Sequence, residues 1–483
     1  MRDQILFSKL VKMQYWLFVK QKTHWLLLFV FFVTGLYGLY QGFAFKGKQI
    51  ATINAFRDEK VGAINEMVKG FHADTTTVAG KEAYQKVTTL ILANWYTILP
   101  AYKIPNTTAL FAIGQGDVFP YYYTVKLESF FMQLFKQNEI TNPLRALAGH
   151  FDVSFWVVLL LPLFIIVLSF NILSSELDNG NWRLINSQGV SQKRWVTSKI
   201  VLVASVTGVL LIVVWLSGLV INYVSFSQPP TLNDFIFFTG ATIYLTLWMS
   251  VLFLINALSL NTSASALYSG VLWVLICIVS PALTTAIIEK TVAVDNTVVS
   301  RMSRRPQGSK FEDDAFGIKT IRQIGVLRPQ YRHATVTPKS KGFSFTVYCA
   351  YHELLDDSNK VVVRQYFDNI EKRQRLTNAS GFINPAAAMD GIFAGLAHND
   401  AEANHRFIWG MMDFHQAFHD ALFPAIFFDR KLSESDFKKL PVQKQASFQH
   451  VPVWVLIHLM SFIVIILLLF RWANTKFKNR LNV

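Results

Sequence analysis

Six apolar runs, each of about 20 residues or more, dominate this 483-residue chain. A helix needs about 20 such residues to cross the hydrocarbon core of a bilayer. Hydrophobic residues make up 52% of the chain and charged residues only 16%, a balance that argues against a soluble enzyme. We therefore predict a mostly α-helical, polytopic membrane protein with six transmembrane helices and two extracytoplasmic, mainly helical segments.

The predicted order begins with a cytoplasmic in-plane amphipathic helix, because Leu6, Leu10, Met13 and Leu17 recur at helical spacing. The full division is that helix (residues 1–24), transmembrane helix 1 (25–45), extracytoplasmic segment 1 (46–150), transmembrane helix 2 (151–173), a cytoplasmic loop (174–199), transmembrane helices 3–5 (200–288), extracytoplasmic segment 2 (289–450), transmembrane helix 6 (451–471) and a cytoplasmic tail (472–483).

Helical periodicity continues through residues 50–71, so we expect the first span to extend outward as one helix. Pro162 is expected to kink the second span. Residues 341–354 are ambiguous between strand and helix, whereas residues 399–423 have strong helical periodicity, with Asn399 or Asp400 as the N-cap.

Lysine and arginine flank three of the span ends: before the first span, between the second and third, and after the sixth. With six spans, these flanks fall on one side, which the positive-inside rule assigns to the cytoplasm. Both termini are then cytoplasmic. The net charge of +15 also suits nucleic-acid binding, but because much of it flanks the spans we predict no nucleic-acid partner.

The loop SSELDNGNWRLINSQGVSQKRW (residues 174–195) is longer, and has more charged and aromatic residues, than a simple link between two spans needs. Ser174 or Ser175 is expected to cap a short amphipathic helix across the ends of two spans, with two acids in its first turn. Its apolar strip comprises Leu177, Leu184 and Ile185, with Trp182 at its edge. Gly189 ends the helix and Ser191 starts the next. An anionic leaflet would repel the two acids, so a socket on another protein suits this helix better than lipid headgroups.

This loop resembles the coupling helix of type-2 ATP-binding-cassette (ABC) exporter permeases. The matching residues are Ser175-Glu176, Asp178, Gly180, Arg183-Leu184, Ser187-Gln188 and Ser191, while Gly189 and Asn181-Trp182 depart from the pattern. The chain is similar to a branch with two large extracytoplasmic inserts, through FAIGQGDVFP (111–120), NPLRALAGHFDVSFWVVLLLPL (142–163) and NPAAAMDGIFAGLAHNDAEANHRF (384–407).

The resemblance implies a multi-pass protein of the bacterial inner membrane that works with a separate ATPase subunit and a second permease chain, as a homo- or heterodimer. The residues it implies for ATPase coupling are Ser175, Glu176, Asp178, Gly180, Arg183, Leu184, Gln188 and Arg194. No G-x-x-x-x-G-K-[ST] motif occurs in the chain, so ATP and Mg²⁺ are expected on the partner ATPase, with no cofactor and no catalytic site on this chain.

His415 and His419 lie four residues apart on one predicted helix face, which is a spacing that can ligate a metal. No HExxH motif accompanies them and the helix is rich in aromatic residues, so we predict no metal site. Ionisable residues in the spans are scarce; Asp152 lies at an outer end and His458 within the sixth span. This scarcity favours ATP over an ion gradient as the energy source.

Three functions fit these observations. The first is an exporter permease that moves a substrate across or out of the inner membrane. The second is a mechanotransmitter, in which ATP-driven motion of the outer segments acts on a periplasmic or outer-membrane partner. The third is a membrane-bound hydrolase, for which the sequence offers no catalytic set.

Overall fold

The computed structural model describes residues 2–89, 97–136, 151–302, 308–444 and 451–479. Six helical segments in this part of the chain are long and apolar enough to cross a membrane, which confirms the predicted fold class. They are α2 (Lys22–Gly70), α7–η2–α8–α9 (Val153–Asp178), α11 (Gln192–Phe226), α12 (Leu232–Ala257), α13–η3–α14 (Thr262–Thr291) and α21 (Val453–Asn479). Residues 142–150, the first part of the second quoted motif, lie outside the described residues.

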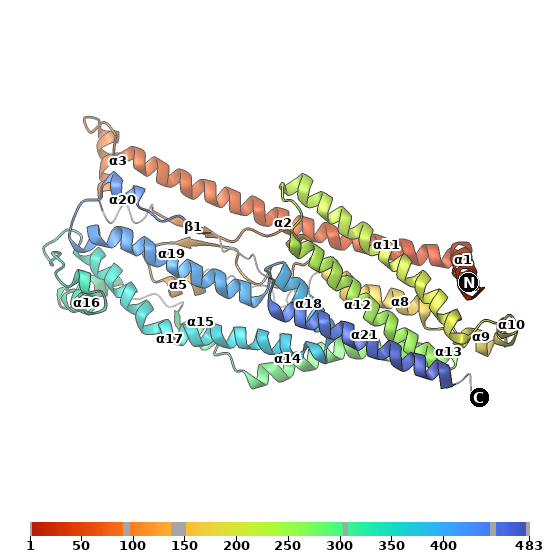
Figure 1. Ribbon diagram of the computed structural model, residues 1–483. Coiled ribbons are helices and arrows are strands. Elements are labelled where there is room, and N and C mark those ends of the chain that lie inside the picture. The colour runs from red at the N-terminus through yellow and green to blue at the C-terminus, as the bar shows by residue number, and fades with distance from the viewer. Residues whose placement is uncertain (1, 90–96, 137–150, 303–307, 445–450, 480–483) are drawn as a thin grey trace.

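Helix α2 is the longest element of the molecule. Its 49 residues extend over about 70 Å at 1.5 Å per residue, more than twice the roughly 30 Å of a hydrocarbon core. It therefore contains the first span and also its predicted outward extension. In Figure 1 it runs from α1 almost to the far end of the molecule, where α3 (Val78–Thr88) follows.

The second span contains one π-helical turn, η2 (Trp156–Leu160), directly before the predicted kink at Pro162. Proline has no N–H, so it cannot bond the carbonyl of Val158 four residues earlier. The hydroxyl of Tyr244 in α12 donates to that carbonyl at 3.0 Å, and the indole of Trp273 in α13 donates to the carbonyl of Leu159 at 3.1 Å. Neighbouring spans thus satisfy the backbone groups that the π turn and the proline release.

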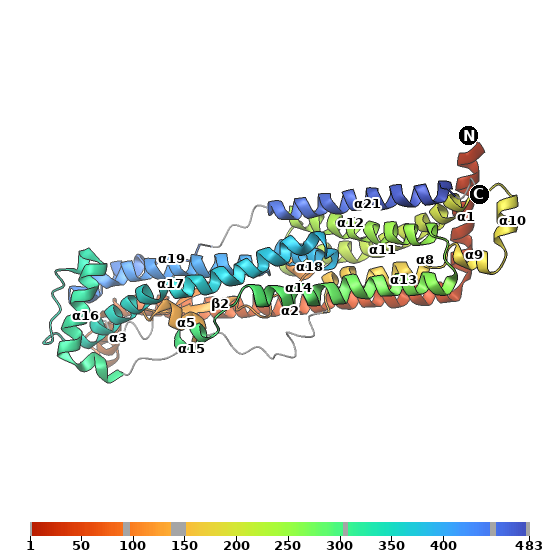
Figure 2. The same cartoon turned by 90° about the horizontal axis from the view of Figure 1, so that it is seen from below.

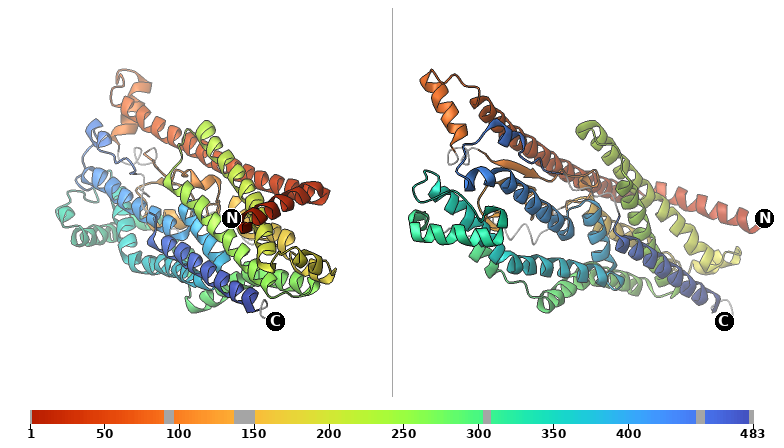
Figure 3. Two further views of the ribbon diagram at one scale, coloured as in Figure 1. Left: turned by 45° about the vertical axis from the view of Figure 1, so that its right-hand side comes forward. Right: turned by 60° about the vertical axis from the view of Figure 1, so that its left-hand side comes forward.

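Helix α1 (Arg2–Lys20) crosses the end of the bundle at a steep angle to the spans, as Figure 2 shows. Leu10 and Phe18 are buried against the bundle. Of the predicted apolar face, Met13 and Leu17 are exposed, at 37% and 39%, and that this helix lies in the membrane plane stays a prediction. The Tyr15 hydroxyl also hydrogen-bonds Ser205 of α11. Helix α1, the 174–199 loop and the end of α21 lie at the same end of the molecule in Figure 3. The assignment of this end to the cytoplasm stays a prediction.

At the opposite end, parts of both predicted outer segments form one distal region with its own hydrophobic cluster. Phe131, Phe367 and Phe418 join this cluster from α5, α17 and α19. The elements of the distal region, besides the outer half of α2 and α3, are β1 (Leu99–Tyr102), β2 (Tyr122–Val125), α5 (Phe130–Lys136), α15 (Thr297–Met302), η4 (Gly308–Glu312), α16 (Asp314–Leu327), η5 (Pro329–Tyr331), α17 (Phe343–Ala379), α19 (Ala401–Phe427) and α20 (Glu434–Lys438).

Two stretches of the distal region can be compared with the secondary structure expected from the sequence. The ambiguous stretch 341–354 is helical, as the start of α17, and α19 begins after Asp400, whose carboxylate accepts the N–H of Ala403 at 3.0 Å. The strands β1 and β2 pair antiparallel, with Leu99 opposite Val125.

Helix α18 (Pro385–Leu396) lies within the range predicted as extracytoplasmic segment 2, yet it packs with the spans. Met389, Ile392 and Phe393 are fully buried in the same hydrophobic cluster as Tyr244 of α12 and Phe462 of α21. With 12 residues, α18 is too short to cross a bilayer. It packs between the distal ends of the spans. The predicted extracytoplasmic segment 2 (289–450) therefore contains residues that pack on the spans as well as residues that pack in the distal region.

Gly42 of α2 lies in close contact with the backbone of Leu110. A Cβ atom at Gly42 would lie 1.9 Å from the carbonyl oxygen of Leu110, whereas a Cβ atom at Gly62, further along the same helix, would have no heavy atom within 4 Å. We expect Gly42→Ala to lower the free energy of unfolding by about 1–3 kcal/mol through overpacking. Gly62→Ala should be neutral or stabilising by about 0.5–1 kcal/mol.

Thermal unfolding of the two purified variants in detergent measures this difference. Equal melting temperatures for Gly42→Ala and the wild type would show that the chain around Leu110 does not pack on α2 as described.

Candidate functional site

The 174–199 loop contains two short helices, α9 (Ser174–Asp178) and α10 (Trp182–Ser187), instead of the single predicted one. Gly180 follows α9 with φ of +73°, and Gly189 follows α10 with φ of +76°. Glycine adopts these left-handed angles without the steric cost that a Cβ imposes. Gly189 thus ends its helix as predicted, while Gly180 adds a break that the periodicity did not reveal.

The apolar side of the loop packs on a small cluster at the end of the bundle. Leu177, Trp182 and Ile185 are partly buried against a core that includes Trp195 and Phe253. The predicted strip was wrong at Leu184, which is 68% exposed. The turn at Gly180 resets the helical phase, so α9 and α10 do not share one continuous face.

Hydrogen bonds fix the two ends of the loop to three spans. The Asp178 carboxylate accepts the backbone N–H of Thr262 at the start of α13 (2.8 Å), and the Trp195 indole donates to the carbonyl of Ile172 (3.1 Å). Ser191 caps α11 by accepting the N–H of Arg194 at 3.4 Å, as predicted. The predicted cap at Ser174 or Ser175 was wrong, because Leu173 stands at the N-cap of α9 and no side chain caps this helix. The Ser174 hydroxyl is buried without a hydrogen-bond partner in the described chain.

The implied ATPase-coupling residues therefore divide into two groups. Arg183, Leu184 and Gln188 project from the loop and are exposed. The others have partners or conformational roles within the chain: Ser175 accepts a hydrogen bond from Asn179 (3.4 Å), Glu176 lies close enough to Lys199 for Coulombic attraction, Asp178 bonds Thr262, Gly180 makes the turn, and Arg194 lies in the first turn of α11.

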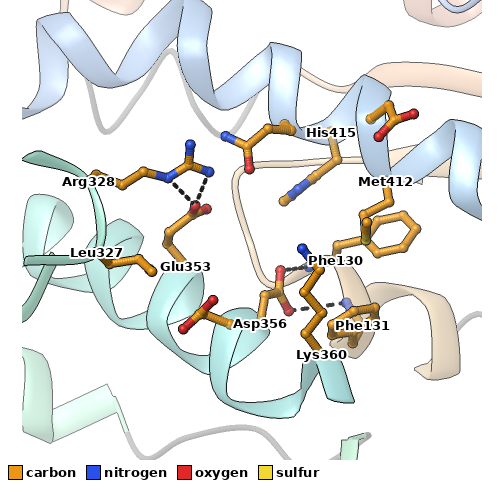
Figure 4. A pocket seen from close by; sticks show the side chains of 12 residues that line it. Phe130, Phe131, Leu327, Arg328, Glu353, Asp356, Lys360, Met412 and His415 are labelled. Carbon is orange, nitrogen blue, oxygen red and sulfur yellow. Dashed lines mark hydrogen bonds and ion pairs between the residues drawn. The ribbon is translucent and has the colours of Figure 1, made fainter. Parts of the chain in front are cut away.

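A second polar cluster lies in the distal region, beside a cavity of about 370 Å³ (Figure 4). The cavity is lined by Phe130, Phe131, Leu327, Arg328, Glu353, Asp356, Asp357, Lys360, Met412, Asp413, His415 and Gln416. Glu353 is its central charged group: Arg328 donates to Oε1 through Nε at 2.9 Å and Nη2 at 2.5 Å, and His419 Nδ1 lies 2.7 Å from Oε2.

Asp356 joins the two predicted outer segments at this cavity, because it lies on α17 and bonds the start of α5. Its carboxylate on α17 accepts the N–H groups of Phe130 (2.6 Å) and Phe131 (3.3 Å), together with the hydroxyl of Ser129, and so holds the start of α5. Burial raises the pKa of Asp356 to about 7, while these hydrogen bonds act in the opposite direction. The carboxylate thus titrates near neutral pH.

The two histidines considered as metal ligands have other partners. His415 Nε2 lies 2.9 Å from the carbonyl of Glu128, to which it can only donate, and His419 Nδ1 is bonded to Glu353. Burial lowers the pKa of His415 well below its usual value, which keeps the imidazole neutral. The absence of a metal stays a prediction, but these contacts direct one nitrogen of each ring away from a shared ion.

Asp368, Glu371 and His405 offer three ligand atoms that lie within 4.8 Å of one another. His405 Nδ1 is 2.7 Å from Glu371, and the Trp409 indole N–H points at His405 Nε2. Because an indole nitrogen only donates, Nε2 must accept and Nδ1 must carry the proton. A metal on Nδ1 would have to displace that proton and leave an imidazolate, so this cluster is better explained as a hydrogen-bond chain.

Sequence reasoning missed one buried cation, Lys46, which follows the first apolar run and was counted with its polar flank. The structure buries it completely, with its ammonium bonded to Asn106, Asn222 and Gln228. The sequence signal was weak, because Asn222 stands within an apolar run and is 176 residues away from Lys46.

Two family models match the chain. Residues 123–245 match the family described as ABC-2 membrane transporter related, and residues 312–444 match a domain of unknown function, DUF3526. The first match supports an ABC-2 type permease. It contains the whole 174–199 loop, and it implies a membrane subunit that works with an ABC ATPase. No curated protein and no solved structure matches the chain.

The charge of Glu353 should make the distal region sensitive to acid. Burial opposes its ionisation, but His419 and Arg328 outweigh this effect and lower its pKa to about 2, below its ordinary value of 4.5. Because the folded-state pKa is depressed, the stabilisation is complete above about pH 5 and is lost as the pH falls toward 2. We expect Glu353→Gln to cost up to about 3 kcal/mol of stability near pH 7 and progressively less toward pH 3.

Melting temperatures of the wild type and Glu353→Gln across pH 3–7 check this expectation. Glu82→Gln, at an exposed position of α3, is the matched control and should show no pH-dependent difference. A difference in melting temperature between wild type and Glu353→Gln that stays constant with pH would contradict the depressed pKa assigned to Glu353.

Proposed function

We propose that this chain is the permease subunit of an ABC exporter, which couples ATP hydrolysis by a separate ATPase to substrate movement across or out of the bacterial inner membrane. ATP and Mg²⁺ bind the partner ATPase, and a second permease chain completes the transporter. The termini and the 174–199 loop face the cytoplasm, and the distal region is periplasmic. The observation that carries the proposal is the exposed α9–α10 turn within the segment that matches the ABC-2 family.

The geometry of the loop suits a docking element that transmits force. Arg183, Leu184 and Gln188 present a cation, an apolar side chain and an amide to solvent. Behind them, Asp178 holds the start of α13 and Trp195 holds the end of the second span. A push on α10 would therefore reach the second, third and fifth spans through side-chain contacts and not through a slack linker.

A mechanotransmitter is the second candidate, and helix α2 favours it. Because α2 continues unbroken from the membrane into the distal region, tilting of the first span also moves the distal region. Motion produced by the ATPase could then act on a periplasmic partner without a substrate passing between the spans.

Docking predicts that the exposed residues of α10 control complex assembly. We expect Arg183→Ala combined with Leu184→Ala to reduce the co-purifying ATPase, and the ATPase rate of the complex, at least five-fold, because a charge pair and an apolar contact are removed together. The measurement uses the permease co-expressed with an ABC ATPase from the neighbouring genes. Lys476→Ala, exposed on α21 at the same end of the molecule, is the matched control and should have no effect.

Unchanged recovery and unchanged rate in the double variant would remove the loop as the ATPase contact. The purified complex in liposomes separates the two candidate functions. Transport without a further protein supports the exporter, whereas ATPase activity that responds only to a periplasmic protein supports the mechanotransmitter.

A further inference from the structure

A loop of residues 105–116, here called the joint loop, lies where the spans meet the distal region. Lys46 of α2 is fully buried against it. Its ammonium donates to the carbonyl of Asn106 at 2.8 Å, to Asn222 Oδ1 of α11 at 2.6 Å and to Gln228 Oε1 at 2.6 Å. All three hydrogens of the ammonium are therefore used, and they connect two spans to one loop.

The acceptors of Lys46 hold the joint loop themselves. Asn222 donates through Nδ2 to the carbonyl of Thr107 at 2.9 Å, and Gln228 donates through Nε2 to the carbonyl of Pro105 at 3.2 Å. Lys46 thus fixes the amide orientation of two side chains that bind the loop backbone. Loss of its ammonium would leave both amide oxygens without this donor.

The fourth span holds the same loop through a buried acid. Asp234 of α12 is fully buried and accepts the hydroxyls of Thr107 at 2.7 Å and Thr108 at 2.8 Å. The loop is therefore held between a cation on one span and an anion on another.

The other side of the joint loop binds the link, residues 396–400, which connects α18 to α19. Asn106 Nδ2 donates to the carbonyl of Leu396 at 2.7 Å, the N–H of Gln115 donates to the carbonyl of Asn399 at 2.9 Å, and Asn399 Nδ2 donates to the carbonyl of Ala112 at 3.1 Å. These bonds join the two outer segments of the sequence next to the membrane.

Close packing leaves little freedom in this arrangement. Phe111 is fully buried, with its ring 5.2 Å from that of Phe237 in α12. A Cβ atom at Gly218 of α11 would lie 2.2 Å from the Phe111 ring, so the ring occupies the space that any larger residue at 218 would need. The joint loop is wedged between α11 and α12 as well as hydrogen-bonded to them.

We propose that Lys46 is the positioning residue that ties the joint loop and the link to the spans, so that α19 moves as one body with α2, α11 and α12. The transmission part of this role rests on the proposed function, whereas the structural part does not. Helix α2 connects the first span directly to the first outer segment. The joint loop and the link form a route from the spans to α19 in the second outer segment.

The first test uses the permease alone in lipid nanodiscs, with amide hydrogen exchange as the readout. Lys46→Met keeps the length of the side chain but removes its three donors. We expect at least ten-fold faster exchange in Ala109–Gln115 and in residues 396–400. Lys48→Met, which replaces an exposed lysine on the same helix, should show no change.

Gln228→Met is a milder second variant, should Lys46→Met fail to fold, and is expected to accelerate exchange in the joint loop. Wild-type exchange in the link of Lys46→Met, or in the joint loop of Gln228→Met, would overturn the positioning role.

The second test uses the complex with the co-expressed ATPase and spin labels at Gly410→Cys of α19 and Tyr223→Cys of α11, both of which are exposed positions. We expect trapping with ATP and vanadate to leave the distance between the two labels unchanged in the otherwise wild-type complex, because the two sites move together. In Lys46→Met the distance should broaden or shift while the ATPase rate stays within two-fold. A distance that shifts equally in both complexes would overturn the coupling. A complex without ATPase activity would instead contradict the proposed function and leave the exchange result intact.

Discussion

Backbone N–H and C=O groups that leave water must find partners inside the protein, and the architecture follows from how the chain meets this demand. Continuous helices satisfy it within the spans. Where a helix is interrupted, side chains from neighbouring spans take over: Tyr244 and Trp273 accompany the π turn before Pro162, and Lys46, Asn222 and Asp234 accompany the joint loop. These side chains bond backbone groups at the places where the helical pattern breaks.

This distribution connects the two ends of the membrane spans. At one end, Asp178 and Trp195 join the 174–199 loop to three spans. At the other, Lys46 and Asp234 join three spans to the joint loop. Helix α11 takes part in both sets of contacts, through Trp195 near its start and Asn222 near its end. A single rigid helix thus lies between the surface proposed for the ATPase and the base of the distal region.

Apolar periodicity was enough to predict the six spans and the outward extension of α2, and the serine after Gly189 was enough to predict the cap at Ser191, because each depends on neighbours along the chain. The features that it missed depend on partners distant in sequence. Lys46 looks like a polar flank until Asn222, 176 residues away, is placed beside it. Helix α18 looks like an outer helix because it is short, and only the packing of Phe393 on Phe237, with ring centroids 4.1 Å apart, places it with the spans. Leu184 was misplaced because a turn at Gly180 shifts the phase of one face.

The same reasoning sorts the residues that resemble a coupling helix. Asp178 holds the start of α13 by accepting the Thr262 N–H, and its side chain is exposed. A carboxylate can accept several hydrogen bonds, so this contact does not prevent a partner from binding the same side chain. Arg183, Leu184 and Gln188 are exposed as well. In the proposed function, Asp178 and Gly180 shape the loop, and the exposed side chains of α10 contact the ATPase.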